Sequence, residues 1–210
     1  MAYQLKGDLR EDALGLWQHL SGRISPSDAS SLNELYAVLH TSGLAVEQDT
    51  TRPEGASYNP RPARLARLLF DFLGKEIDPA LLAAAFILGC YGDAPRRESL
   101  CERARSASDA NLWQCAHDIA SQASRALLGE AGVTGAELSS PIATLAAIKI
   151  LDDVRHLHQR SLEGLARKDK LADYLATCQR LRAIGAEERV LVLIEAAGER
   201  LQRRREFRAT

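Results

Sequence analysis

The sequence lacks several features that mark specialised protein classes. It has only four cysteines in 210 residues, and no two of them form a Cys-x-x-Cys pair. A disulfide framework or a cysteine-based zinc site is therefore not expected. Neither sign of charge is in excess, since 27 Lys and Arg face 28 Asp and Glu for a net charge of −1. Because dedicated nucleic-acid binders usually carry a basic excess, we expect no nucleic-acid partner.

Long apolar runs are also missing. No stretch of about 18 uninterrupted apolar residues is present, so we expect no membrane span. Residues 1–8 carry no secretory signal pattern. These absences predict a cytoplasmic protein with reduced thiols.

Residues that favour strands are scarce. The chain has 6 Val and 9 Ile against 33 Ala and 32 Leu, and this balance predicts an all-α fold. Apolar residues recur at helical spacing almost throughout, and Asp28, Asp78 and Ser108 or Asp109 are expected caps. We expect one globular domain over 1–210. Its eight or nine helices should lie near residues 8–20, 26–43, 62–73, 79–88, 96–105, 109–128, 141–158, 168–184 and 187–205.

The segment 44–60 is rich in turn residues, and long irregular segments inside a domain are often functional. Its second half runs into Arg52-Pro53-Glu54-Gly55-Ala56-Ser57-Tyr58-Asn59-Pro60-Arg61-Pro62. This run resembles the Arg-Lys-Ser-Gly-Glu-Pro-Tyr-x-x-His-Pro motif of the RelA/SpoT-type HD-domain hydrolases. Segment 83–90 resembles the family's apolar helix that ends in a His-Asp doublet, and 148–156 resembles its Val-Lys-Leu-Ala-Asp-Arg-Leu-His-Asn stretch. The resemblance covers about 32–158, with the C-terminal helices 162–206 expected to pack on that region.

The resemblance implies an HD-type fold and hydrolysis of the 3′-pyrophosphate of guanosine polyphosphate alarmones. The family holds a divalent metal, usually Mn²⁺, with a His, a His-Asp doublet and a later Asp. Such a metal polarises the phosphate and supplies a water nucleophile near neutral pH.

This chain departs from the family at most of the metal ligands. Arg61 stands in place of the first His, Gly89-Cys90 in place of the doublet, and only Asp152 is kept. Of the acidic pair that follows the doublet, only Asp93 remains. A guanidinium carries a fixed positive charge, and one carboxylate does not hold a catalytic metal. We therefore expect no cofactor and a catalytically inactive protein that binds a nucleotide or a protein partner.

A ligand pocket without catalysis is one consequence of these departures. Arg52 falls where the family places an Arg against the guanine base. Arg61 would pair with a phosphate bidentately, or it would form a structural ion pair with Asp152 in a refilled metal site. The candidate pocket residues are Arg52, Tyr58, Arg61, Asp93, Asp152 and His156.

Two other interpretations remain open. A true alarmone phosphohydrolase with a rearranged Mn²⁺ site would use Asp152 and His156, which are four residues apart on one helix, together with His117 and Asp118. The adjacent side chains of His117 and Asp118 diverge by about 100° on a helix, which disfavours a shared site. The remaining interpretation is a plain helical module that interacts with another protein. The sequence predicts no particular oligomeric state.

Overall fold

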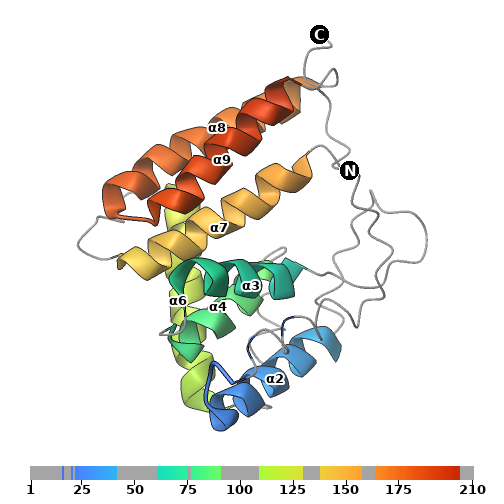
Figure 1. The fold of residues 1–210 in the computed structure, drawn as a ribbon, viewed down its shortest axis with the longest axis vertical. Coiled ribbons are helices and arrows are strands. Elements are labelled where there is room, and N and C mark those ends of the chain that lie inside the picture. Colours follow the sequence, from blue (N-terminus) through green and yellow to red (C-terminus); the bar gives the residue numbers. More distant parts are fainter. Residues whose placement is uncertain are drawn as a thin grey trace. The chain divides into compact units, whose positions relative to one another are not determined.

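The protein is built from α-helices, as predicted. The structure, a computed structural model, describes residues 16, 20, 22–41, 61–74, 77–90, 109–129, 138–157 and 164–203. This part of the chain forms seven α-helices and contains no strand (Figure 1). The helices are α2 (Pro26–Thr41), α3 (Arg61–Leu73), α4 (Pro79–Cys90), α6 (Ala110–Leu128), α7 (Ser140–His156), α8 (Gly164–Ile184) and α9 (Glu188–Gln202).

Polar side chains cap the starts of several helices. Asp78 and Asp109 each accept a hydrogen bond from the backbone N–H two residues further on, at 2.8 and 2.9 Å, as predicted. At α2 our expectation is corrected. The hydroxyl of Ser25, and not Asp28, accepts the orphan backbone N–H, which is that of Asp28 itself at 3.1 Å. The Asp28 carboxylate instead accepts a hydrogen bond from the Ser25 hydroxyl at 2.6 Å.

The described helices divide into two compact units, of which the first contains α2, α3, α4 and α6 up to Asp118. Helix α4 is its centre. Every residue from Ala80 to Cys90 is buried, because a helix that is apolar all round must be covered all round. Helices α2 and α3 both pack on it, and the rings of Tyr36 and Phe86 pack in a T-shaped arrangement with 5.3 Å between centroids. The prediction of a central buried helix is confirmed.

Helices α3 and α4 form a hairpin whose backbones approach closely. A Cβ atom placed on Gly89 would lie 2.7 Å from the Cα of Pro62 and 2.8 Å from its nitrogen. Since these are backbone atoms, they cannot rotate away as a side chain would. A glycine at position 89 therefore permits the first turn of α3 to lie against the last turn of α4.

Replacing Gly89 by Ala should destabilise the chain, because the new methyl group meets the Pro62 backbone. Overpacking of this kind typically costs about 1–3 kcal/mol. Gly198→Ala in α9 is the matched control, since its Cβ would meet only the flexible ends of Leu171, at 3.3 Å, and Leu175, at 3.7 Å. Both variants gain about 1 kcal/mol of helix propensity, so their difference isolates the clash. Urea unfolding should show the lower midpoint for Gly89→Ala, and equal midpoints would contradict the account.

The second unit begins at Ile119 and contains the rest of α6 with α7, α8 and α9. Helix α7 packs on both α8 and α9, and these two helices pack on each other. From Ile142 to Val154 every residue of α7 is buried except the half-buried Lys149. Helix α7 therefore supplies the core of this unit.

Two hydroxyl groups of α7 hold the turn between α8 and α9. The buried Thr144 hydroxyl donates to the Ser140 carbonyl at 2.8 Å and accepts the backbone N–H of Glu187 at 3.0 Å. The Ser140 hydroxyl donates to the carbonyl of Gly185, whose φ of 93° is a left-handed conformation that favours glycine. The turn is thus tied to the first turn of α7 through an accepting carbonyl, that of Gly185, and a donating N–H, that of Glu187.

We expect Thr144→Val to loosen this turn, because the variant keeps the shape of Thr but leaves the Glu187 N–H without its acceptor. Loss of one partner of a buried hydrogen bond costs about 1–3 kcal/mol. Hydrogen exchange at the Glu187 amide should become faster in Thr144→Val and remain slow in Thr144→Ser, which keeps the hydroxyl. Unchanged protection in Thr144→Val would show that this bond does not hold the turn.

Two expectations concern the chain as a whole, namely that it has no membrane span and that it forms one domain. Among the described helices, none combines the length and the hydropathy that crossing a bilayer requires. The division into units cuts α6 after Asp118 although α6 is one continuous helix. The expectation of one domain over 1–210 stays a prediction.

Candidate functional site

The first candidate site is the α3–α4 junction, which we define as Arg61, Pro62, Gly89 and Cys90. Arg61 is the first residue of α3 and only 9% exposed, and Cys90 is the last residue of α4 and also buried. The Pro62–Gly89 contact brings the backbones of the two helix ends together. The structure therefore places side by side the two segments that resemble the family's segments with the first His and with the His-Asp doublet.

The electrostatics of the α3–α4 junction favour an anion over a divalent cation at Arg61. The N-terminus of α3 carries a partial positive charge from its helix dipole, and the guanidinium of Arg61 adds a full one. The C-terminal carbonyls of α4 carry a partial negative charge. These carbonyls can stabilise a buried positive charge there, but less strongly than a carboxylate would. A phosphate matches the planar fork of an arginine in both charge and geometry.

The second candidate site is a row of polar side chains on α7. Asp152 and Asp153 are 3% and 5% exposed, although α7 is the core helix of its unit. Lys149 Nζ lies 3.1 Å from Oδ2 of Asp153 in an ion pair. Our sequence reasoning did not single out this pair, whose signal was its spacing of four residues.

His156 has a defined orientation in this row. Its Nδ1 lies 2.7 Å from the backbone carbonyl oxygen of Asp152 and 3.5 Å from Oδ1 of the same residue. Since a carbonyl only accepts, Nδ1 must carry the proton, and Nε2 is then the accepting nitrogen of the neutral ring. The imidazole is 29% exposed. Because the ring is partly exposed, its Nε2 is a candidate acceptor for a ligand or a candidate base.

The remaining predicted pocket residues, Arg52, Tyr58 and Asp93, lie outside the described residues. Arg61 belongs to the first unit, and Asp152 and His156 belong to the second. Their joint role in one pocket, and the alternative ion pair between Arg61 and Asp152, stay predictions.

The alternative metal ligands on α6 lie at a partly exposed position. His117 Nδ1 is 3.6 Å from Asp118 Oδ1, and Asp118 also accepts a hydrogen bond from the Gln114 amide at 3.0 Å. The His117 ring packs beside Trp113, with 5.9 Å between centroids. Within the described ranges, no group of three or more His, Cys, Asp or Glu side chains lies so that it could hold a metal ion.

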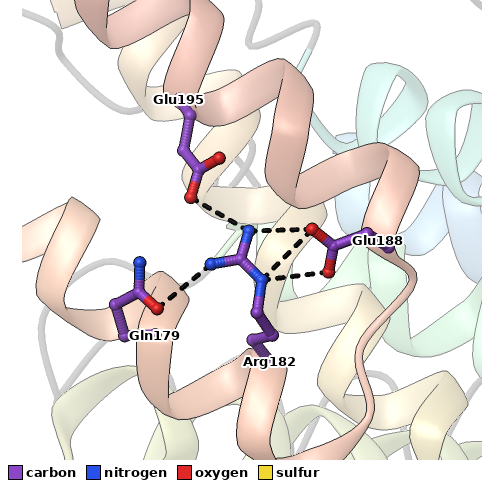
Figure 2. Close-up of polar contacts among 4 residues, drawn as sticks. All are labelled: Gln179, Arg182, Glu188 and Glu195. Carbon is purple, nitrogen blue, oxygen red and sulfur yellow. Dashed lines mark hydrogen bonds and ion pairs between the residues drawn. The ribbon is translucent and has the colours of Figure 1, made fainter.

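A third polar cluster lies on the α8–α9 hairpin and was not foreseen from the sequence. Arg182 donates to both carboxylate oxygens of Glu188, to Glu195 at 2.9 Å and to Gln179 at 3.1 Å (Figure 2). The hydrogen bond from Arg182 lowers the pKa of Glu188, and hydrogen bonds to Glu188 and then Glu195 raise the pKa of Arg182. The cluster links α8 and α9. Because it is open to solvent, it adds little to the stability of the fold.

The described cysteines are free thiols with different surroundings. Burial, and after it the charge of Glu195, raises the pKa of Cys178 to about 12, although Arg182 partly opposes the shift. Cys115 is exposed and Cys90 is buried. A thiol reacts through its thiolate, so burial in this protein protects Cys178.

Cys115 should react with iodoacetamide at about pH 8 in the folded protein, and Cys178 should not. With a pKa of about 12, only about one in ten thousand Cys178 thiols is ionised at that pH. Peptide mass spectrometry after brief labelling would report each site, and labelling in urea, where both sites are accessible, is the control. Equal rates at the two cysteines in the folded protein would contradict the burial of Cys178.

Comparison with known proteins found no family model, no curated protein and no solved structure that matches this chain. The geometry described above establishes an all-α helical protein. None of these comparisons supports an HD-type relationship, which stays a prediction from the sequence resemblance.

Proposed function

We propose that this chain is a divergent HD-type helical protein that binds a guanine nucleotide through its phosphates without hydrolysing it. The observation that carries the proposal is the buried guanidinium of Arg61 at the α3–α4 junction. A buried guanidinium at a helix N-terminus forms a positively charged position. An anionic ligand would add a charge-assisted contact to the interactions that Arg61 already has within the protein.

The arrangement of the hairpin supports the HD-type part of the proposal. The family requires its first His and its His-Asp doublet to share one metal, and the corresponding positions here lie at two helix ends in contact. In any antiparallel helix hairpin the start of the first helix lies near the end of the second. This support therefore depends on Arg61 being at the start of α3 and Cys90 at the end of α4. Both residues lie at these positions, and both are buried.

The residue types at the α3–α4 junction support binding without hydrolysis. Gly89 offers no side chain, Cys90 is a buried thiol, and Arg61 repels a cation. Hydrolysis in the family needs a metal that several deprotonated ligands hold in a fixed geometry. A bidentate arginine–phosphate contact needs no metal.

A protein-interaction module is the second candidate function. It is favoured by large apolar side chains that are exposed in the described part of the chain, namely Leu128 at the end of α6 and Val192 and Leu193 on α9. In that case Arg61 would have a structural role only.

Guanosine tetraphosphate should raise the melting temperature of the intact chain in a buffer that contains EDTA. A ligand at 100 times its Kd adds about 2.7 kcal/mol, which corresponds to about 5–10 °C for a protein of this size. Arg61→Gln should abolish most of the shift, and Arg61→Lys should keep part of it. Arg67→Gln, which removes the same charge from an exposed position of α3, is the matched control and should keep the full shift.

Other outcomes of this experiment distinguish the candidate functions. Stabilisation that requires Mn²⁺, together with release of pyrophosphate, would support the rearranged phosphohydrolase and overturn our proposal. If no nucleotide shifts the melting temperature, the interaction module is the remaining candidate.

A further inference from the structure

Helix α9 has an outer face that no described part of the chain covers. Its buried residues, Val190, Leu191, Ile194, Gly198 and Leu201, lie on one side of the helix. That is the side from which α9 packs on α7 and α8. On the opposite side Val192 is 51% exposed, and Leu193 beside it is 39% exposed. Large apolar side chains are usually less accessible than this in a helix that already packs on two neighbours.

The exposed side follows a regular spacing. We define the α9 seam as the residues at alternating intervals of three and four, which are Arg189, Val192, Ala196, Glu199 and Arg203. Such spacing brings the five side chains into one stripe along the helix. The centre of the stripe is apolar and the ends are charged.

The charges of the α9 seam are balanced within the chain. Arg189 Nε lies 2.6 Å from Oε1 of Glu187, and Arg203 Nη2 lies 3.4 Å from Oε2 of Glu199. A face of this kind has no strong net charge with which to attract an acidic or a basic partner. Exposed pairs contribute at most about 1 kcal/mol, so they can be exchanged for equivalent pairs with another molecule.

An antiparallel pairing of two α9 helices makes this seam complementary to itself. In one register, Val192 of one chain lies opposite Ala196 of the partner subunit, and Arg189 lies opposite Glu199 of the partner subunit. Two-fold symmetry produces each of these contacts twice. The small side chain at Ala196 lets the larger Val192 pack against it, and Arg189 meets the opposite charge of Glu199, whereas Arg203 lies beyond the paired part of the seam.

We propose that the occupant of the α9 seam is a second copy of this chain, docked antiparallel in this register. A single pair of helices of this length buries less than the about 800 Å² per partner of a standard interface. We therefore expect a reversible dimer in exchange with the monomer. This inference does not rest on nucleotide binding.

Sedimentation velocity of the intact chain over about a hundred-fold range of concentration should show monomer converting to dimer. Val192→Glu would put a carboxylate at the centre of the α9 seam and should abolish the dimer. The matched control is Ala176→Glu, at an exposed position of α8 outside the seam, and it should leave the dimer unchanged. A chain that stays monomeric throughout, or a dimer that survives Val192→Glu, would overturn the proposal.

A charge exchange tests the register. Arg189→Glu alone and Glu199→Arg alone each place like charges opposite one another and should weaken the dimer by about tenfold. The double variant restores opposite charges across the two-fold axis, so its dissociation constant should return close to that of the unaltered chain. If the substitutions only destabilised the fold, the double variant would dimerise more weakly than either single variant. That result would overturn the proposed register.

Discussion

The contact between the backbones at Pro62 and Gly89 is the constraint on which the candidate site depends. It brings the ends of α3 and α4 so close that Arg61 and Cys90 are both buried in the first unit. A larger residue at position 89 would push the helix ends apart and admit water to the guanidinium. The same glycine also removes the side chain that the family resemblance assigns to metal binding. If the resemblance holds, the close packing of the two helices and the absence of that metal ligand have the same cause, the glycine at position 89.

The second unit depends on buried polar groups that are each satisfied locally. Thr144 serves as both donor and acceptor between α7 and the α8–α9 turn, and Lys149 lies beside the buried Asp153. Buried polar groups are costly unless they are paired. The Thr144 contacts therefore fix where the turn meets α7, and the Lys149–Asp153 pair satisfies a buried carboxylate within α7 itself. The orientation of His156 follows from the same rule, since its Nδ1–H is held by a backbone carbonyl. A unit arranged in this way presents His156 at a defined angle without requiring a bound ligand.

Much of the helical pattern could be predicted from the sequence, because apolar spacing and caps are local signals. The starts of α4 and α6 follow from Asp78 and Asp109, and the glycine after α8 marks its end. The start of α8 at Gly164, four residues before the expected one, was missed because charged residues conceal its apolar spacing there. The Arg182 cluster and the Thr144 bond were missed because they join residues from different helices. For the candidate site, spacing alone indicated that Asp152 and His156 share a face, whereas the junction of Arg61 with Gly89 was indicated only by the resemblance and required the structure.

The central claim is that this chain binds the phosphates of a guanine nucleotide without a metal and leaves them intact. Phosphorus NMR of guanosine tetraphosphate, recorded first with the intact chain in EDTA and again after incubation with Mn²⁺ and removal of that metal by excess EDTA, tests both parts. Our account predicts signals that shift in a saturable manner in EDTA and that remain free of inorganic pyrophosphate after the incubation with Mn²⁺. Signals that do not shift in EDTA, or pyrophosphate that appears once the metal is present, would contradict it.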